Sequence, residues 1–430
     1  MTRLTRVWIV CGLFTAIGCD NDKPAPPVPQ TGLTSIAATV NAAEPAATAE
    51  AFWPHWRGPK HDGIATGTVA TPWPETGLPQ LWKQQVGIGF SSIAIADGRL
   101  YTMGWKDGSE TVFCFDHLTG EERWHHSYLG RKVDNLHDGG PGATPTIDGQ
   151  HVYTLGREGQ LFCLDTESGK VVWQKKLPEE SGVEVPEWGF TSSPLVEGDM
   201  LIVDAGRVMA FDKATGDKRW ETGKFRPGYG SAAAFERNKD RHIAVFNNDC
   251  LLIVKASDGA EVARYPWESS YATTSTTPIV HGDTIFISSG YGRGCALLKW
   301  QGDQLVEVYD HKEMANHFNN SVLHEGHLYG IHGNTHNNRL GKIVCMDHQT
   351  GAVRWSQRGY GVGSLLISEG KCLVLSDEGE LVVCRASGDK YEELAKAKIL
   401  DGLCWTVPVL AGGHIYARNA AGDLVCVKLP

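Results

Sequence analysis

The eleven-residue stretch CFDHLTGEERW, at Cys114–Trp124, returns three times along this chain. The copies are CLDTESGKVVW at Cys163–Trp173, AFDKATGDKRW at Ala210–Trp220 and CMDHQTGAVRW at Cys345–Trp355. Three further stretches keep the glycine of the turn but lack the tryptophan, at Gly259, Gly302 and Gly388. From Gly120 onward the seven glycines are 37 to 49 residues apart. A repeat of about 45 residues is typical of one blade of a β-propeller.

Alternating apolar residues within each repeat predict four short strands. In the copy at Ala210–Trp220, the Asp212 carboxylate can accept hydrogen bonds from the N–H groups of a tight turn, and Gly216 can take a positive φ. Trp220 begins the outer strand, where its ring can be buried against the next blade. We therefore predict structural, blade-docking roles for Trp82, Asp116, Gly120, Trp124, Asp165, Gly169, Trp173, Asp212, Gly216, Trp220, Asp347, Gly351 and Trp355.

Counting the repeats predicts the architecture. Seven complete units run from about Ser91 to Leu400, and the remaining C-terminal residues supply only three more strands. The missing fourth strand is QLWKQQVG at Gln80–Gly87, which places Trp82 in the repeated tryptophan position. The predicted fold class is an all-β, eight-bladed β-propeller of four-stranded blades, in which an N-terminal strand closes the last blade and so removes the exposed edges of an open ring.

The repeated phrase A/C-x-D-x-x-T/S-G-x-x-x-W resembles the tryptophan-docking motif of the pyrroloquinoline quinone (PQQ) repeat family. WPHWRGPKHDG at Trp53–Gly63 is similar to the lead-in of bacterial PQQ-like propellers. The family includes quinoprotein dehydrogenases and also non-enzymatic scaffolds, such as a lipoprotein of the outer-membrane β-barrel assembly machinery. The resemblance implies that an enzymatic member holds PQQ and a divalent ion, typically with a disulfide between adjacent cysteines. This sequence has no adjacent cysteines, so we expect the non-enzymatic branch.

The N-terminal residues resemble an export signal. Residues 1–19 combine Arg3 and Arg6 with the apolar run VWIVCGLFTA and end at Cys19, as in the signal peptide of a bacterial lipoprotein. Ala16 stands where leucine is usual in that motif, so cleavage by an ordinary signal peptidase is the alternative. Residues 20–51 are rich in Pro, Ala and Thr and predict a flexible tether, followed by the propeller at 52–430. We expect a periplasm-facing membrane lipoprotein of the bacterial cell envelope, lipidated on Cys19.

Composition excludes some classes of ligand. The net charge of −10 argues against nucleic acid, which requires a basic face. Nine cysteines remain after Cys11 and Cys19, and three of them share a repeat position with Ala210, which predicts mostly buried, free thiols. Six histidines between positions 311 and 336 fall on different turns, so we predict no metal site.

The best candidate site is the mouth of the central channel, because the first residues of the innermost strands surround it. Small hydroxyl side chains dominate these positions, and we favour the interpretation that they are needed where eight strands converge, with water filling the channel. The alternative is a polar pocket with an aromatic wall, suited to a small polar ligand. The candidate ligand- or cofactor-binding residues are Ser91, Ser92, Thr144, Thr191, Ser192, Thr276, His317, Asn319, Asn320, Trp405 and Thr406.

No nucleophile elbow or zinc-protease motif is present, and we predict no catalytic residues. The favoured function is a non-catalytic, monomeric envelope propeller that binds a protein or peptide, with outer-membrane protein assembly suggested by the resemblance. One alternative is a small PQQ-dependent alcohol or sugar dehydrogenase with PQQ and calcium at the channel mouth. Another is a ligand-sensing propeller without chemistry.

Overall fold

The computed structural model describes residues 51–132, 137 and 139–430. The predicted signal peptide with Cys19, and all of the predicted tether except Ala51, lie outside the described residues. Among the residues that are described, no helix is long and apolar enough to cross a membrane.

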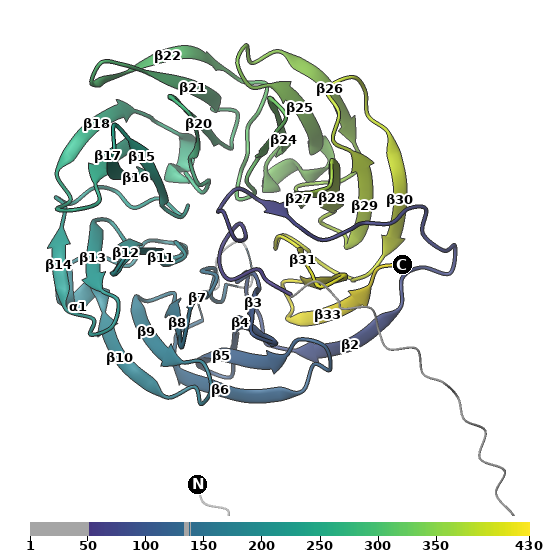
Figure 1. The fold of residues 1–430 in the computed structure, drawn as a ribbon, viewed down its shortest axis with the longest axis horizontal. Coiled ribbons are helices and arrows are strands. Elements are labelled where there is room, and N and C mark those ends of the chain that lie inside the picture. The colour runs from purple at the N-terminus through teal and green to yellow at the C-terminus, as the bar shows by residue number, and fades with distance from the viewer. Residues whose placement is uncertain (1–50, 133–136, 138) are drawn as a thin grey trace, which may run out of the picture. The chain divides into compact units, whose positions relative to one another are not determined.

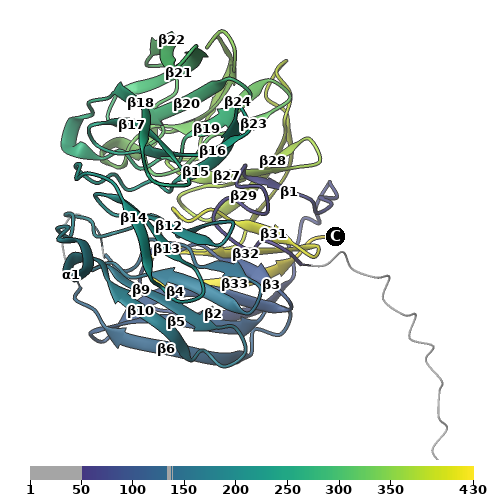
Figure 2. The ribbon, with the colours of Figure 1, turned by 60° about the vertical axis from the view of Figure 1, so that its left-hand side comes forward.

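Eight antiparallel sheets stand in a ring around a central channel, which confirms the predicted eight-bladed β-propeller (Figure 1). The strands of each blade follow one another outward, so that β6 and β22 lie on the rim in both views (Figures 1 and 2). Blade 1 contains β3 (Ala94–Ala96), β4 (Arg99–Lys106), β5 (Ser109–Asp116) and β6 (Glu122–Leu129). Blade 2 contains β7 (Thr146–Asp148), β8 (His151–Leu155), β9 (Gln160–Asp165) and β10 (Val171–Lys176), followed by the short helix α1 (Leu177–Ser181).

The other blades repeat this order. Blade 3 contains β11 (Leu195–Glu197), β12 (Met200–Asp204), β13 (Val208–Asp212) and β14 (Lys218–Glu221). Blade 4 contains β15 (Ala233–Arg237), β16 (Asp240–Phe246), β17 (Cys250–Lys255) and β18 (Glu261–Pro266), and a 3₁₀ turn, η1 (Ser270–Ala272), follows it. Blade 5 contains β19 (Ile279–His281), β20 (Thr284–Ser289), β21 (Gly294–Gln301) and β22 (Gln304–His311). Blade 6 contains β23 (Val322–His324), β24 (His327–His332), η2 (Thr335–Leu340), β25 (Lys342–Asp347) and β26 (Val353–Arg358). Blade 7 contains β27 (Ser364–Ser368), β28 (Lys371–Leu375), β29 (Glu380–Arg385) and β30 (Glu393–Lys398).

Blade 8 closes the ring as predicted. Its three C-terminal strands, β31 (Val409–Ala411), β32 (His414–Arg418) and β33 (Asp423–Lys428), are completed by β2 (Gln80–Gln85), which pairs antiparallel with β33. Arg418 reinforces the seam from inside, because its fully buried guanidinium donates to the carbonyl oxygens of Gly87, shortly after β2, and of Met103, on β4 of blade 1. The two ends of the propeller are therefore joined both by strand pairing and by a buried charge.

The repeated phrase docks each blade on the next. The ring of Trp173 lies over Gly216 of blade 3, where an added Cβ would approach the indole to 2.7 Å. Its indole N–H donates to the Lys213 carbonyl oxygen at 3.1 Å. Gly216 has a φ of 77°, so both the backbone conformation and the close ring require glycine. The same indole-to-carbonyl bond joins Trp82 to His117, Trp124 to Thr166, Trp220 to Ala256 and Trp355 to Ser387.

The repeated turn itself is held by its aspartate. Asp212 Oδ1 accepts from the N–H groups of Ala214 and Thr215, at 2.9 and 3.0 Å, and Oδ2 accepts from Arg219. Because Arg219 and the turn N–H groups bind the ionised form, the pKa of Asp212 is lowered to about 2. In blade 5, whose repeat lacks tryptophan, Tyr309 makes the corresponding contact: its hydroxyl donates to the His348 carbonyl oxygen of blade 6.

The lead-in WPHWRGPKHDG crosses the channel, as the purple segment in the centre of Figure 1 shows. Trp53 exchanges two backbone hydrogen bonds of 2.8 Å with Ile95 of blade 1, while the Arg57 guanidinium donates to the Ser321 carbonyl oxygen ahead of blade 6. The short strand β1 (Ile64–Ala65) then pairs in parallel with β27 of blade 7. This one segment therefore connects blades 1, 6 and 7 across the centre of the ring.

Docking by tryptophan predicts a large, position-specific effect on stability. Trp173→Ala removes a side chain that is 8% exposed together with its hydrogen bond, and should lower the free energy of unfolding by about 3–5 kcal/mol. Val172→Ala is the matched control, because the neighbouring Val172 on β10 is 48% exposed and should cost less than about 0.5 kcal/mol. Urea denaturation of the two variants measures both values. Equal losses would show that the ring does not carry the inter-blade contact.

Candidate functional site

A cavity of about 720 Å³ lies at the channel mouth, and Trp56 of the lead-in lines it, so the lead-in bounds its inner end. The indole N–H of Trp56 donates to Thr277 Oγ1 of blade 5 at 3.0 Å, which holds this ring in place. The lining side chains come from loops and strand starts of nearly every blade around the ring. They are Trp56, Phe90, His137, Gly139, Gly140, Gly142, Arg157, Trp188, Thr191, Ser193, Tyr229, Gly230, Ser231, Thr273, Ser275, Tyr291, His317, Phe318, Thr335, His336, Leu403, Trp405, Thr406 and Val407.

The lining follows a simple register. In seven of the eight blades, the residue four places before the first residue of the inner strand lines the cavity. These residues are Phe90, Gly142, Thr191, Tyr229, Ser275, Phe318 and Trp405. In blade 7 the equivalent Tyr360 is buried and pairs through its hydroxyl with Tyr391. The position four before the inner strand therefore supplies seven of the lining residues.

The predicted site residues divide into two groups. Thr191, His317, Trp405 and Thr406 line the cavity. The remaining seven do not line it and are buried two or three residues before their strands, at the level where the blades meet. They are Ser91, Ser92, Thr144, Ser192, Thr276, Asn319 and Asn320.

Several of these buried residues join neighbouring blades. The Ser92 N–H donates to Thr144 Oγ1 at 3.2 Å, and the Thr144 N–H donates to Ser193 Oγ at 3.0 Å. Across the ring, Asn320 Oδ1 accepts from the Thr277 N–H, and Asn320 Nδ2 donates to the Thr277 carbonyl oxygen at 2.9 Å. Short polar side chains at these positions therefore satisfy backbone groups where the inner strands converge.

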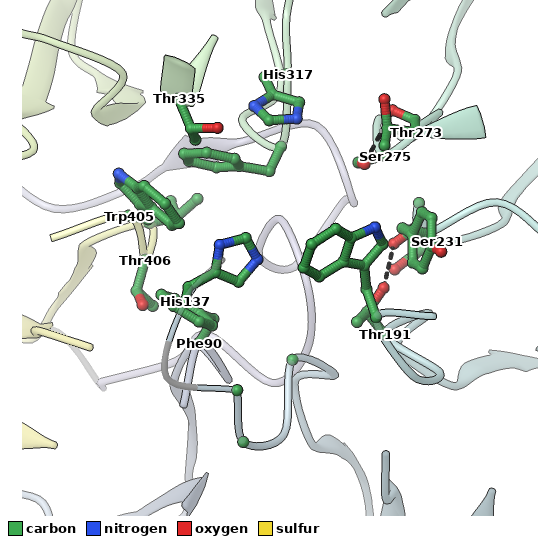
Figure 3. A pocket seen from close by; sticks show the side chains of 18 of the residues that line it. Phe90, His137, Thr191, Ser231, Thr273, Ser275, His317, Thr335, Trp405 and Thr406 are labelled. Atoms are coloured by element: carbon green, nitrogen blue, oxygen red, sulfur yellow. Dashed lines mark hydrogen bonds between the residues drawn. The ribbon is translucent and has the colours of Figure 1, made fainter. Parts of the chain in front are cut away.

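Aromatic rings form much of the cavity wall (Figure 3). Trp405 contacts Phe90 and Phe318, with ring centroids 5.4 and 4.7 Å apart, and His137 stacks on Trp188 at 4.6 Å. Figure 3 shows Trp405, His137 and Phe90 on one side, with Thr191 and Ser231 on the other. Except for Trp405, sequence reasoning missed these rings, although Phe90 and Phe318 stand directly before residues that it selected.

Two strained tyrosines stand beside this wall. Tyr271 and Tyr291 have φ values of 64° and 52°, and their ring centroids are 4.9 Å apart. The Tyr291 ring also meets the edges of His317 and His336, at 4.7 and 5.3 Å. A bulky side chain in the left-handed region costs about 1–2 kcal/mol, and such strain concentrates at binding and catalytic sites.

The charge of the described lining is small. Arg157 is 3% exposed and donates from Nη2 to the Glu187 carbonyl oxygen at 3.0 Å. His317 is 7% exposed, and burial together with the nearby His137 and His336 lowers its pKa to about 4, so it is neutral at pH 7. Within the described lining there is no aspartate or glutamate.

These residues do not fit a calcium-bound PQQ. Calcium takes about 6–8 oxygen ligands and favours carboxylates, whereas the described lining offers hydroxyl and backbone oxygens. In the part of the chain that the structure describes, no three His, Cys, Asp or Glu side chains are grouped so as to hold a metal ion. The described cysteines are all buried free thiols.

The ring of eight blades and its docking tryptophans define the chain as a PQQ-like β-propeller. The family model described as "Outer membrane protein assembly factor BamB" matches residues 108–357, more than half of the chain. The chain therefore belongs to this family of PQQ-like propellers.

Individual relatives share the same name. The chain is 21% identical over 303 residues to "Outer membrane protein assembly factor BamB" of Yersinia pestis, a match that covers 65% of this chain and 72% of that protein. It is 27% identical over 164 residues to the protein of that name from Moranella endobia (strain PCIT), covering 36% of this chain. That second match spans only 37% of the length of the Moranella protein.

Solved structures share the fold at low identity. BamB from Moraxella catarrhalis superimposes with a TM-score of 0.60 at 15% identity, covering 82% of this chain and 99% of that one. A europium-containing methanol dehydrogenase gives a TM-score of 0.65 at 12% identity, covering 88% and 89%. Quinohemoprotein alcohol dehydrogenase from Comamonas testosteroni gives 0.63 at 12% identity, covering 89% and 81%. Since assembly factors and dehydrogenases share this fold, the fold alone does not choose between them.

The buried His317 predicts how acid acts on stability. Between about pH 6.5 and 4 the unfolded chain binds a proton at His317 and the folded chain does not, so this group makes folding less favourable as the pH falls. The loss is at most about 1.4 kcal/mol per pH unit. His317→Gln removes this linkage, so its free energy of unfolding should fall by about 2 kcal/mol less than that of the parent chain between pH 7 and 4.5. Urea titrations at both pH values measure the difference.

His125→Gln, at an exposed position on the outer strand β6, is the control and should follow the parent chain. Parallel pH profiles for the parent chain and His317→Gln would contradict the burial of a neutral histidine.

Proposed function

We propose that this chain is a non-catalytic propeller of the bacterial cell envelope that binds a protein partner during outer-membrane protein assembly. The observation that carries the proposal is the lining of the cavity, in which rings and hydroxyls are described without any carboxylate. Removal of a hydride from an alcohol requires a base for the hydroxyl proton, whereas an aromatic wall binds apolar groups without one. The names of the family model and of the curated relatives support outer-membrane assembly as the process.

The proposed location follows from the N-terminal sequence. Export by the signal of residues 1–19, lipidation on Cys19 and the tether that ends at Ala51 would hold a monomeric propeller at a membrane, facing the periplasm. An envelope location is consistent with relatives named for assembly at the outer membrane.

Loss of the chain should impair the outer membrane. In a strain without it, the abundance of outer-membrane β-barrel proteins should fall, because their assembly would lack one binding component. Quantitative proteomics of the outer-membrane fraction, normalised to an outer-membrane lipoprotein, measures the change, and expression of the full chain should restore it. Unchanged levels of every β-barrel protein would contradict the proposal.

The alternative is a small quinoprotein with PQQ and calcium at the channel mouth, supported by the same fold in two dehydrogenases. Because the described lining provides no carboxylate for calcium, we expect no saturable rise in melting temperature when the purified chain is titrated with PQQ and calcium. A ligand at about 100 times its Kd would stabilise the fold by about 2.7 kcal/mol, which is easily detected. A saturable rise in melting temperature together with dye-linked oxidation of alcohols would show that the chain is an enzyme and not a non-catalytic scaffold.

A further inference from the structure

We propose that the channel-mouth cavity binds an aromatic side chain presented by an extended polypeptide. This inference rests on the proposed function, in which the partner is a protein, and it names the part of the partner that is recognised. Four features of the described residues support it: the rings of the wall, the engagement of two of the hydroxyls, the small charge and the apolar loops around the mouth.

The wall is built to contact a flat apolar group. Trp405, Phe90 and Phe318 form one continuous surface of rings, Trp188 adds a ring through His137, and Trp56 lines the inner end. Aromatic pairs favour centroid separations of about 4.5–7 Å, the range that these rings already occupy with one another. An inserted phenyl, phenol or indole ring would extend the same packing.

Two of the lining hydroxyl groups are already engaged with the backbone, whereas Thr406 Oγ1 and Trp405 Nε1 are buried without a hydrogen-bond partner among the described residues. Thr191 Oγ1 donates to the Tyr229 carbonyl oxygen at 2.7 Å, and Ser275 Oγ donates to the Thr273 carbonyl oxygen at 3.2 Å (Figure 3). These side chains can still accept a hydrogen bond, but their donors are already used. A sugar brings several hydroxyls, and each one that is buried without a partner weakens binding. A hydrocarbon ring has no such requirement.

The charges argue against a free aromatic amino acid. Its ammonium and carboxylate would both lose hydration on entering the cavity and would need partners there. Arg157 is the one permanently charged side chain in the described lining, and it is almost fully buried against the Glu187 carbonyl oxygen. The same ring within a polypeptide is neutral, and its backbone amides can remain at the mouth, in water.

Exposed apolar residues stand on loops that also carry residues of the cavity lining. Tyr271, which is 74% exposed, contacts the Tyr291 ring in a tilted arrangement, and Leu340, which is 50% exposed, ends the η2 turn that carries His336. Another exposed apolar residue, Val185, stands three residues before Trp188, which lines the cavity. Exposed apolar groups gathered around a cavity are typical of a protein-binding site, and an extended polypeptide can cover the loops while one side chain enters.

Binding of designed peptides to the purified full chain tests the inference. The probes are dye-labelled, end-capped Gly/Ser peptides of equal length with a single central Phe, Trp or Ala, measured by fluorescence anisotropy. We expect the Phe and Trp peptides to bind at least about tenfold more tightly than the Ala peptide, a difference of about 1.4 kcal/mol. Equal affinity of all three peptides would overturn the proposal. So would tighter binding of free phenylalanine or of N-acetylglucosamine, measured by competition.

Variants of the wall locate the binding. Trp405→Ala and Phe318→Ala should reduce the affinity for the Phe peptide about tenfold, to that for the Ala peptide. Phe318→Leu keeps an apolar side chain and guards against loss of folding, and should retain part of the affinity. Phe52→Ala is the matched control, because Phe52 is 47% exposed and does not line this cavity. Equal losses in Phe52→Ala and Phe318→Ala would overturn the assignment to the cavity.

Complementation separates this inference from the proposed function. If Trp405→Ala restores β-barrel proteins fully and the peptides do not bind, the cavity assignment fails while the scaffold function stands. If the peptides bind but loss of the chain leaves β-barrel proteins unchanged, the cavity assignment stands and outer-membrane assembly fails. Binding together with failed complementation by Trp405→Ala supports both.

Discussion

The contact between a tryptophan ring and the glycine turn of the next blade is the interaction on which the rest of this structure depends. A four-stranded blade cannot bury both of its faces alone, and neighbouring blades must meet at a fixed distance. The pair of Trp173 and Gly216 sets that distance, because the ring occupies the space that a Cβ would need and its N–H ties it to the same turn. The indole-to-carbonyl bond recurs at five of the blade interfaces, and these contacts help to bring the inner strands together at the centre.

Because the inner strands converge at the centre, positions that are only two residues apart have different roles. Two residues before the strand the blades touch, and short side chains such as those of Thr144 and Asn320 bind backbone groups of a neighbouring blade. Four residues before the strand the chain has spread outward, so residues as large as Trp405 and Phe318 fit and face open space. The buried polar residues two or three places before the inner strands are therefore a consequence of the fold. The residues four places before the strands, which form the cavity wall, can vary in their chemistry.

The repeats made the architecture predictable from the sequence. The site could not be predicted in the same way, because the lead-in and the loops that build it do not repeat. The spacing of Gly120 and its counterparts gave the number of blades, and the match of Gln80–Gly87 to the outer strands revealed how the ring closes. The lead-in has no internal period, so its path across the channel, and the place of Trp56 in the cavity, could not be derived from pattern. His137 and Trp188 lie on loops whose courses depend on tertiary contacts. Phe90 could have been found from the sequence, because it stands directly before Ser91 and Ser92. The pattern of small hydroxyl residues selects those two serines, which lie one or two positions closer to the inner strand than the cavity wall.

Scaffolds and dehydrogenases share this eight-bladed ring, so function has to be argued from the residues that line the cavity and not from the buried polar residues before the inner strands. In this chain the lead-in bounds the inner end of the cavity through Trp56, which leaves the mouth, with its aromatic and apolar loops, as the approach for a ligand. A reactive centre would need ionised groups kept in place by partners, and burial opposes this, as the lowered pKa of His317 illustrates. Rings need no such support, since their attraction to an apolar group grows as water is excluded. The same burial that makes charge costly here makes aromatic recognition favourable.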